Sequence, residues 1–190
     1  MDIRRFFFKF RGFTPVPLVL FIFWFAHPTW FTFWTGLLIA TVGELIRIWG
    51  VGHAGRATRT RNVDAENLVT SGPFRYVRNP LYLGNLLIYS GFTFLSGVWL
   101  PWSVILALIL FIFQYYFIVS LEEEYLLDKF GPAYENYRNQ VPRFFPRLVP
   151  WKDGTRIHIK LREPLQSERS TLIGYIIFPL AVLTRWYLFP

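Results

Sequence analysis

Three observations in the sequence predict an all-α integral membrane protein with about five transmembrane helices. Of the 190 residues, 53% are hydrophobic and only 17% are charged, which is not the composition of a soluble protein. Most of the five apolar stretches approach the length of about 20 residues that a helix needs to cross a bilayer. Lys and Arg are concentrated between some of these stretches and are missing between others. Helices are expected because hydrocarbon offers no partners for backbone N–H and C=O groups.

Short turns without charge pair four of the five stretches into two hairpins. The first stretch is short and ends at His27 and Pro28, and the turn around Gly97 and Pro101 closes the second hairpin. We expect the first stretch to be kept in the protein, because the small residues of a signal-peptide cleavage site do not follow it. The five stretches are residues 13–26, 30–51, 81–98, 102–121 and 172–189.

The distribution of cations predicts the orientation in the membrane. Of the 20 Lys and Arg residues, four precede the first stretch, five lie from Arg56 to Arg78, and nine lie from Lys129 to Arg169. The positive-inside rule therefore places the N-terminus and both long basic segments in the cytoplasm, and the C-terminus outside. Anionic membrane lipids are expected partners for the net charge of +8. A nucleic-acid partner is not expected, because it would need a soluble basic face.

The sequence also limits the chemistry that the protein can perform. It contains no cysteine, which excludes disulfides, thiolate metal sites and a cysteine nucleophile. The three histidines, His27, His53 and His158, are scattered without the spacing of metal ligands, so no metal site is expected.

The first cytoplasmic segment ends with a motif at the start of the third stretch. Asn79 is a favourable helix N-cap, and Pro80 suits the first helical position. In one interpretation Arg78 and Arg75 only hold this helix start at the lipid head groups. In the other, the free N–H groups of the helix and Arg78 bind a carboxylate or phosphate.

The second cytoplasmic segment opens with three consecutive carboxylates, Glu122, Glu123 and Glu124. The helix that carries them is expected to end at Gly131, and Pro132 is expected to start another. Consecutive helical residues point about 100° apart, so the three carboxylates cannot all face one ligand. Either one or two turn inward, or all three form a solvated helix end.

Together these residues resemble the isoprenylcysteine carboxyl methyltransferase and phospholipid methyltransferase superfamily of integral membrane enzymes. The resemblance covers about residues 48–146 and depends on two motifs, separated by a helical hairpin, that are far more specific together than alone. Its residues are Gly72, Arg78-Asn79-Pro80-Leu81-Tyr82, Gly84, Glu122-Glu123-Glu124, Phe130-Gly131, Tyr134, Tyr137, Arg143 and Pro146.

The resemblance implies a cytoplasm-facing pocket for S-adenosylmethionine, which a lipid or other hydrophobic small-molecule substrate reaches from the membrane. We expect a single membrane domain, residues 1–190, with a methyltransferase core at about 30–150 and a C-terminal extension with the fifth helix at 151–190, which lies outside the resemblance. Arg78 and Asn79 would take part in catalysis. The residues that would bind the cofactor include a segment, 66–69, that is expected to be strand-like. They are Glu66, Asn67, Leu68, Val69, Phe74, Asn79, Pro80, Leu81, Tyr82, Glu122 and Glu123.

Two departures from the superfamily bear on the substrate. Asn79 stands where relatives have histidine, so this side chain cannot titrate near neutral pH. Ile118 stands where the enzymes that methylate a prenylcysteine carboxylate have an arginine. We therefore expect a neutral acceptor, an amine, thiol or hydroxyl, in preference to that carboxylate.

Two alternatives stay open at this point. Membrane sterol and steroid reductases have similar motifs but use NADPH, and the basic residues Arg56, Arg59 and Arg61 could receive its 2′-phosphate. A relative that keeps the fold without activity would also be consistent with Asn79 and Ile118.

Overall fold

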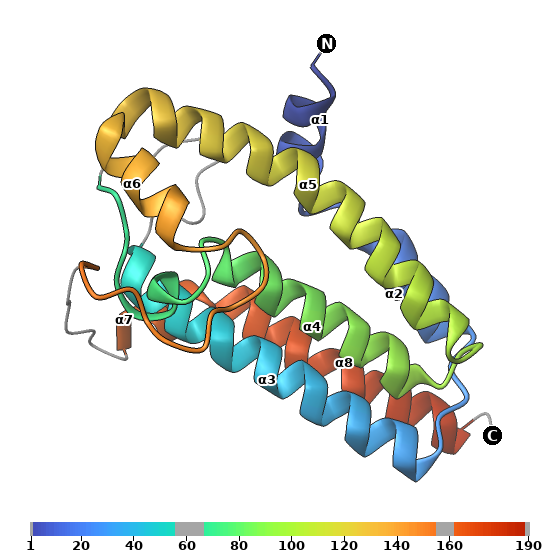
Figure 1. Cartoon of the computed structure of the whole chain (residues 1–190). Coiled ribbons are helices and arrows are strands. Elements are labelled where there is room, and N and C mark those ends of the chain that lie inside the picture. The colour runs from blue at the N-terminus through green and yellow to red at the C-terminus, as the bar shows by residue number, and fades with distance from the viewer. Residues whose placement is uncertain (1, 56–66, 155–161, 189–190) are drawn as a thin grey trace.

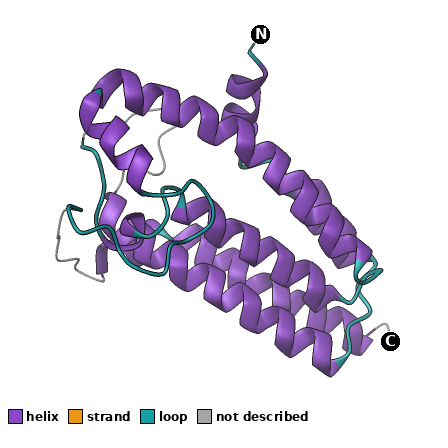
Figure 2. Ribbon diagram, in the orientation of Figure 1, coloured by secondary structure: helices purple, strands orange, loops and turns teal. Residues whose placement is uncertain are grey.

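The computed structural model describes residues 2–55, 67–154 and 162–188 (Figure 1). Figure 2 shows that this described part consists of helices and loops, without a strand. The expected all-α class is confirmed. The helices are α1 (Ile3–Phe10), α2 (Val16–Trp24), α3 (Trp30–Ala54), the 3-10 helix η2 (Gly72–Arg75), α4 (Pro80–Ser96), α5 (Trp102–Phe130), α6 (Pro132–Gln140), α7 (Arg162–Ser167) and α8 (Arg169–Leu188).

Three helices, α3, α5 and α8, are long and apolar enough to cross a membrane. The third expected span, α4, has 17 residues and packs against α3, α5 and α8. The first expected span is shorter than the sequence indicated, because α2 has nine residues and is only about 13.5 Å long. Pro15 and Pro17 at its start explain this length, since proline has no backbone N–H to continue a preceding helix.

The helix α1 was not predicted from the sequence. It precedes the first expected stretch and lies along α5. Asp2 caps α1 by accepting a hydrogen bond from the Arg4 backbone N–H at 2.9 Å. Phe7 stacks on Phe117 of α5 with ring centroids 5.5 Å apart, and Arg4 pairs with Glu124 near the end of α5. The N-terminus therefore lies at the same end of the bundle as the glutamates of α5.

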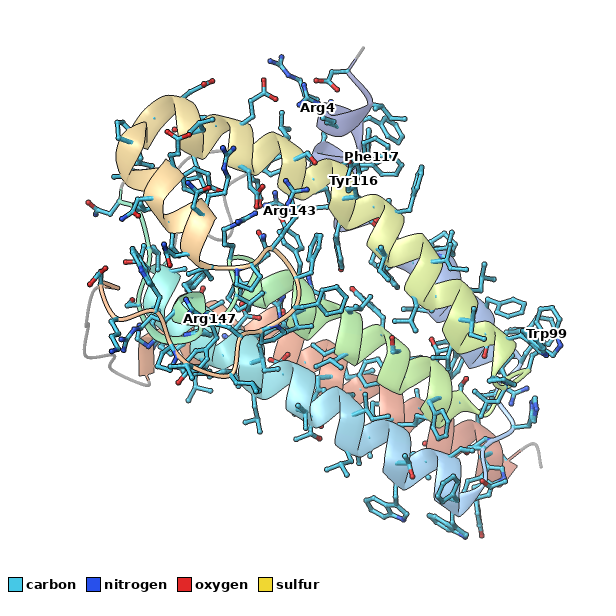
Figure 3. All side chains as sticks on the ribbon, in the orientation of Figure 1. Arg4, Trp99, Tyr116, Phe117, Arg143 and Arg147 are labelled. Atoms are coloured by element: carbon cyan, nitrogen blue, oxygen red, sulfur yellow. The ribbon has the colours of Figure 1, made fainter. Side chains whose placement is uncertain are left out.

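The opposite end of the bundle is rich in tryptophan. His27 donates its backbone N–H to the Ser96 carbonyl at 2.9 Å, which joins the two hairpin turns. Trp186 of α8 packs on Trp30 at 4.9 Å, so the C-terminus lies at this end as well (Figure 1). Trp99, at the same end, is 65% exposed (Figure 3). Exposed tryptophans are typical of the interface between membrane and water.

A row of glycines brings α3 and α4 into backbone contact. A Cβ atom added to Gly43 would lie 2.6 Å from the Gly84 carbonyl oxygen, and one added to Gly91 would lie 2.6 Å from the Gly36 carbonyl oxygen. Only glycine allows so close an approach, and such contacts are the usual basis of tight helix packing in membranes. We call this contact the glycine seam.

Aromatic rings fill the contact between α4 and α5. Tyr89 stacks on Phe111 with centroids 4.4 Å apart, and Tyr82 packs on Tyr115 at 4.8 Å. We call this contact the aromatic seam. It leads from the tryptophan-rich end of α5 to the glutamates at the other end, and so it positions the wall next to the candidate site.

Candidate active site

The loop that precedes α4 is tied to the segment that follows α6. Arg78 donates its backbone N–H to the Pro142 carbonyl at 2.9 Å, and Arg147 donates to the Tyr76 carbonyl at 3.0 Å. A third bond, from Trp151 to the Arg75 carbonyl, measures 2.9 Å. The two motif-bearing segments, which are more than 40 residues apart in the sequence at Arg78 and Glu123, therefore meet in the structure.

Glu123 is buried between two arginines. Arg78 donates from Nε to Glu123 Oε1 at 3.0 Å, and Arg143 donates from Nε to Glu123 Oε2 at 3.0 Å. Arg143 lies on the segment after α6 and faces α5 (Figure 3). Arg143 was not among the predicted site residues, although it belonged to the second motif.

Arg78 also holds the end of α6. Its Nη1 donates to the carbonyls of Arg138 and Val141, at 2.6 and 2.8 Å. Free carbonyls at a helix C-terminus attract a cation in this way. The guanidinium is therefore largely used in structural contacts, and only Nη2 has no partner among the described residues.

Asn79 occupies the N-cap position of α4 and Pro80 its first position, as expected, but the Asn79 side chain does not cap the helix. Its Nδ2 instead donates to the Arg143 carbonyl at 3.2 Å. The first N–H groups of α4 are thus left without a side-chain cap from Asn79. The second interpretation of the motif, in which this helix N-terminus binds an anion, stays a prediction.

Glu122 faces the first turn of α4. The Tyr82 hydroxyl donates to Glu122 Oε1 at 2.7 Å, and Oε2 accepts no bond within the described part of the chain. Arg11, from the turn between α1 and α2, adds positive potential at Glu122 and Tyr82. Glu122 is thus a half-buried carboxylate with one oxygen available.

The three glutamates therefore point in three different directions, as expected for consecutive residues of a helix. Glu122 points to Tyr82, Glu123 is buried between arginines, and Glu124 is exposed beside Arg4. The interpretation in which all three form a solvated helix end is wrong.

Ile118, one turn before the glutamates, is fully buried. It belongs to an apolar cluster with Phe8, Phe111 and Tyr115. The position at which this sequence lacks the arginine of the prenylcysteine enzymes is therefore part of an apolar wall.

Two predicted residues, Leu68 and Phe74, contact the α6 region. Leu68 packs against Tyr134, Tyr137 and Val141 of the α6 region. Burial raises the pKa of the Tyr134 and Tyr137 hydroxyls, so both remain protonated at neutral pH. The Tyr137 hydroxyl donates to the Phe74 carbonyl at 2.8 Å.

The remaining predicted residues lie in varied surroundings. Leu81 lies over Gly50 of α3, with its Cδ2 2.8 Å from an added Gly50 Cβ. Pro80 is buried, Asn67 is exposed and Val69 is partly buried. The strand-like conformation expected around Leu68 and Val69 is wrong, because residues 67–70 are irregular and have no strand partner among the described residues. Glu66, and the residues Arg56, Arg59 and Arg61 of the reductase alternative, lie outside the described residues.

The structure thus assembles one cluster, which we call the candidate site. It contains two cations, one buried carboxylate, one half-buried carboxylate, an amide and a phenol, next to the uncapped start of α4. Its residues are Arg78, Asn79, Tyr82, Glu122, Glu123 and Arg143.

The sequence of this chain is similar to those of a known family and of several known proteins. A family model described as phospholipid methyltransferase matches residues 31–133. The chain is 34% identical to the cobalt-zinc-cadmium resistance protein CzcN of Cupriavidus metallidurans over 70% of this chain and 61% of that protein. It is 33% identical to a protein-S-isoprenylcysteine O-methyltransferase of Schizosaccharomyces pombe, over 57% of this chain and 47% of that protein.

A further relative is a methanethiol S-methyltransferase of Bradyrhizobium diazoefficiens, which is 30% identical over 60% of this chain and 44% of that protein. The chain thus spans about half of the length of these curated relatives. No solved structure matches the chain.

Proposed function

Because the chain belongs to the phospholipid methyltransferase family, we propose that it transfers the methyl group of S-adenosylmethionine to a neutral nucleophile on a lipid or other hydrophobic small molecule. The observation that supports this most is the half-buried Glu122, which keeps one oxygen available beside Tyr82 and the start of α4. The isoprenylcysteine and methanethiol relatives are both named as methyltransferases, and both of their named acceptors are small or lipid-like.

The residues of the candidate site fit this cofactor. Glu122 Oε2 can accept hydrogen bonds from the two ribose hydroxyls. The uncapped N–H groups of α4, together with Arg78 Nη2 and the partly exposed Arg143, can bind the cofactor carboxylate. Phe74 and the segment from Asn79 to Tyr82 would form the surrounding wall. The roles of Asn67, Leu68, Val69 and Glu123 near the cofactor stay predictions.

The mechanism needs little acid–base chemistry. When bound, S-adenosylmethionine supplies a methyl group on a sulfonium that is already activated. The chain must hold the acceptor in line with that methyl group and keep water away. The buried aromatic rings of Tyr115 and Phe111 provide such a dry wall, and Tyr82 and Asn79 would orient the reacting groups at its edge.

The wall around Ile118 supports a neutral acceptor. An unpaired carboxylate beside this fully buried aliphatic side chain would cost several kcal/mol. Arg78 and Arg143, the two cations of the candidate site, pair with Glu123, and their remaining donors are proposed to bind the cofactor carboxylate. A neutral amine, thiol or hydroxyl avoids this cost.

A binding experiment tests the cofactor. The purified protein in detergent is titrated with S-adenosylhomocysteine and, separately, with NADPH. We expect saturable binding of S-adenosylhomocysteine alone. Binding of NADPH alone would favour the reductase alternative, and binding of neither would favour a relative without activity.

A transfer experiment tests the acceptor. The protein is incubated with methyl-labelled S-adenosylmethionine and either a prenylcysteine analogue or a membrane lipid extract. We expect stable labelled products from the lipid extract and little base-labile methyl ester. Efficient formation of the ester would contradict the neutral acceptor and would show that a cation such as Arg143 or Arg11 replaces the missing arginine.

The candidate site and the N-terminus are proposed to face the cytoplasm. Because the chain has no cysteine, single cysteines can be introduced at the exposed positions Glu135, in α6, and Trp99. An impermeant thiol reagent added to intact cells should label the cysteine at position 99 and not the one at 135. Labelling of both, or of position 135 alone, would contradict this orientation.

A further inference from the structure

We propose that Glu168, at the junction of α7 and α8, is a positioning residue for the candidate site and acts on it through Arg47 and Asn85. This inference rests on the proposed function, since it concerns how Glu122 is held for the cofactor. Glu168 belongs to the C-terminal extension, which lies beyond residues 31–133 that match the family model.

Arg47 of α3 connects this extension to α4. Its Nη2 donates to Glu168 Oε2 at 2.6 Å, and its Nη1 donates to Asn85 Oδ1. Glu44, one turn earlier on α3, lies 3.7 Å from Arg47 Nε. The side chains of Glu168, Glu44 and Arg47 are 1%, 5% and 13% exposed, so these charges are withdrawn from water inside the helix bundle.

Gly84 allows Arg47 to reach across α4. A Cβ atom added at Gly84 would lie 2.6 Å from Cγ of Arg47, so the arginine side chain lies directly on the glycine. Asn85 follows Gly84 in the first turns of α4. A side chain at position 84 would therefore push Arg47 away from Asn85, which gives this motif glycine a second role beside the glycine seam.

From Asn85 the contacts continue to the candidate site. Asn85 lies on the same face of α4 as Tyr82 and Tyr89, whose rings pack on Tyr115 at 4.8 Å and on Phe111 at 4.4 Å, so its side chain lies next to Tyr115. Tyr82 in turn donates to Glu122 at 2.7 Å. Each contact restricts the position of the next side chain, so Glu168 is connected to Glu122 through a series of neighbouring side chains: Arg47, Asn85, Tyr115 and Tyr82.

Glu168 is itself firmly placed. Its backbone N–H donates to the Pro164 carbonyl at 2.8 Å, and its carbonyl accepts from Leu172 of α8 at 2.9 Å. Buried ion pairs contribute little net stability, and intramembrane charges are costly. An apolar residue at position 168 would hold α8 equally well. We therefore explain the charge of Glu168 by the side chains that it positions.

A double-mutant cycle tests the inference by measuring the affinity for S-adenosylhomocysteine. Glu168→Gln keeps the size of the side chain and removes its charge, and we expect about fivefold weaker binding. In a Glu122→Gln background the same change should have no further effect, because Glu168 acts through Glu122. Glu168→Asp, which restores the carboxylate, should recover part of the affinity. Gln166→Ala, an exposed change in α7, should leave binding unchanged.

Tyr115→Phe provides a milder interruption of the same contacts in case Glu168→Gln does not fold. It removes only the hydroxyl next to Asn85 and should weaken binding to a similar extent. Losses that add up in the double variant, or unchanged binding in both Glu168→Gln and Tyr115→Phe, would overturn this inference and leave the proposed function intact. A wild-type protein that does not bind S-adenosylhomocysteine would overturn the proposed function, and this inference with it.

Discussion

The two sides of α4 are packed in opposite ways. Toward α3, glycines such as Gly43 and Gly84 bring the two backbones together, so that even one added carbon atom would collide. Toward α5, pairs of rings such as Tyr89 and Phe111 separate the backbones. The glycine seam leaves no space for a ligand, whereas the aromatic seam carries the phenol of Tyr82 to the candidate site.

This difference indicates a division of labour within one helix. The glycine seam fixes the rotation and height of α4, and therefore the direction in which its opposite face points. That face carries Tyr82 and Asn85, one turn apart, toward Glu122 and Tyr115 of α5. A rigid contact on one side thus positions functional groups on the other.

The largest expected effect is at the glycine seam. Gly43→Leu should lower the free energy of unfolding by about 3 kcal/mol, because the new side chain would collide with the Gly84 carbonyl and with Leu87. The measurement is thermal unfolding in detergent. Gly174→Leu on α8 is the matched control, since nothing lies within 4 Å of an added Cβ there. Equal melting temperatures for the two variants would contradict the close approach of α3 and α4.

The next effect concerns ligand binding and leaves the glycine seam untouched. Glu122→Ala should weaken binding of S-adenosylmethionine by at least about tenfold, since it removes charge-assisted hydrogen bonds to the ribose. Glu124→Ala is the control, because that carboxylate is exposed and pairs with Arg4. Isothermal titration of both variants makes the comparison. Equal and negligible changes would mean that Glu122 does not contact the cofactor.

The smallest effect is expected in the aromatic seam. Phe111→Leu should lower the free energy of unfolding by about 1 kcal/mol, because it loses the stacked contact with Tyr89 but keeps an apolar side chain. The same thermal unfolding measurement checks it. A loss as large as that of Gly43→Leu would show that the two seams do not differ in the way proposed.

Much of the helical framework followed from local sequence. The expected stretches at 30–51 and 102–121 became α3 and α5, and the end of α5 at Gly131 followed from its glycine and the following proline. Apolar length and helix-capping residues are local signals, which explains why they were sufficient. The first stretch, 13–26, forms only the nine-residue α2, because Pro15 and Pro17 keep this helix from continuing toward α1.

The candidate site was predictable in its residues but not in its contacts. Three consecutive glutamates differ only in direction, and packing of α5 against α4 decides that Glu122 meets Tyr82. Asn79 was expected to cap α4, but a carbonyl 64 residues away at Arg143 accepts its hydrogen bond. The importance of Arg47 could have been recognised, because a lone cation within an apolar stretch is a functional signal.

The central claim, that the start of α4 and Glu122 hold the cofactor, is tested most directly by photochemical labelling. The purified protein is irradiated with methyl-labelled S-adenosylmethionine, and the labelled residues are located by peptide mass spectrometry. We predict label within residues 74–82 or 115–122, which excess S-adenosylhomocysteine displaces and which Glu122→Ala abolishes. Label confined to other segments, such as α8, or label that excess S-adenosylhomocysteine does not displace, would contradict the account.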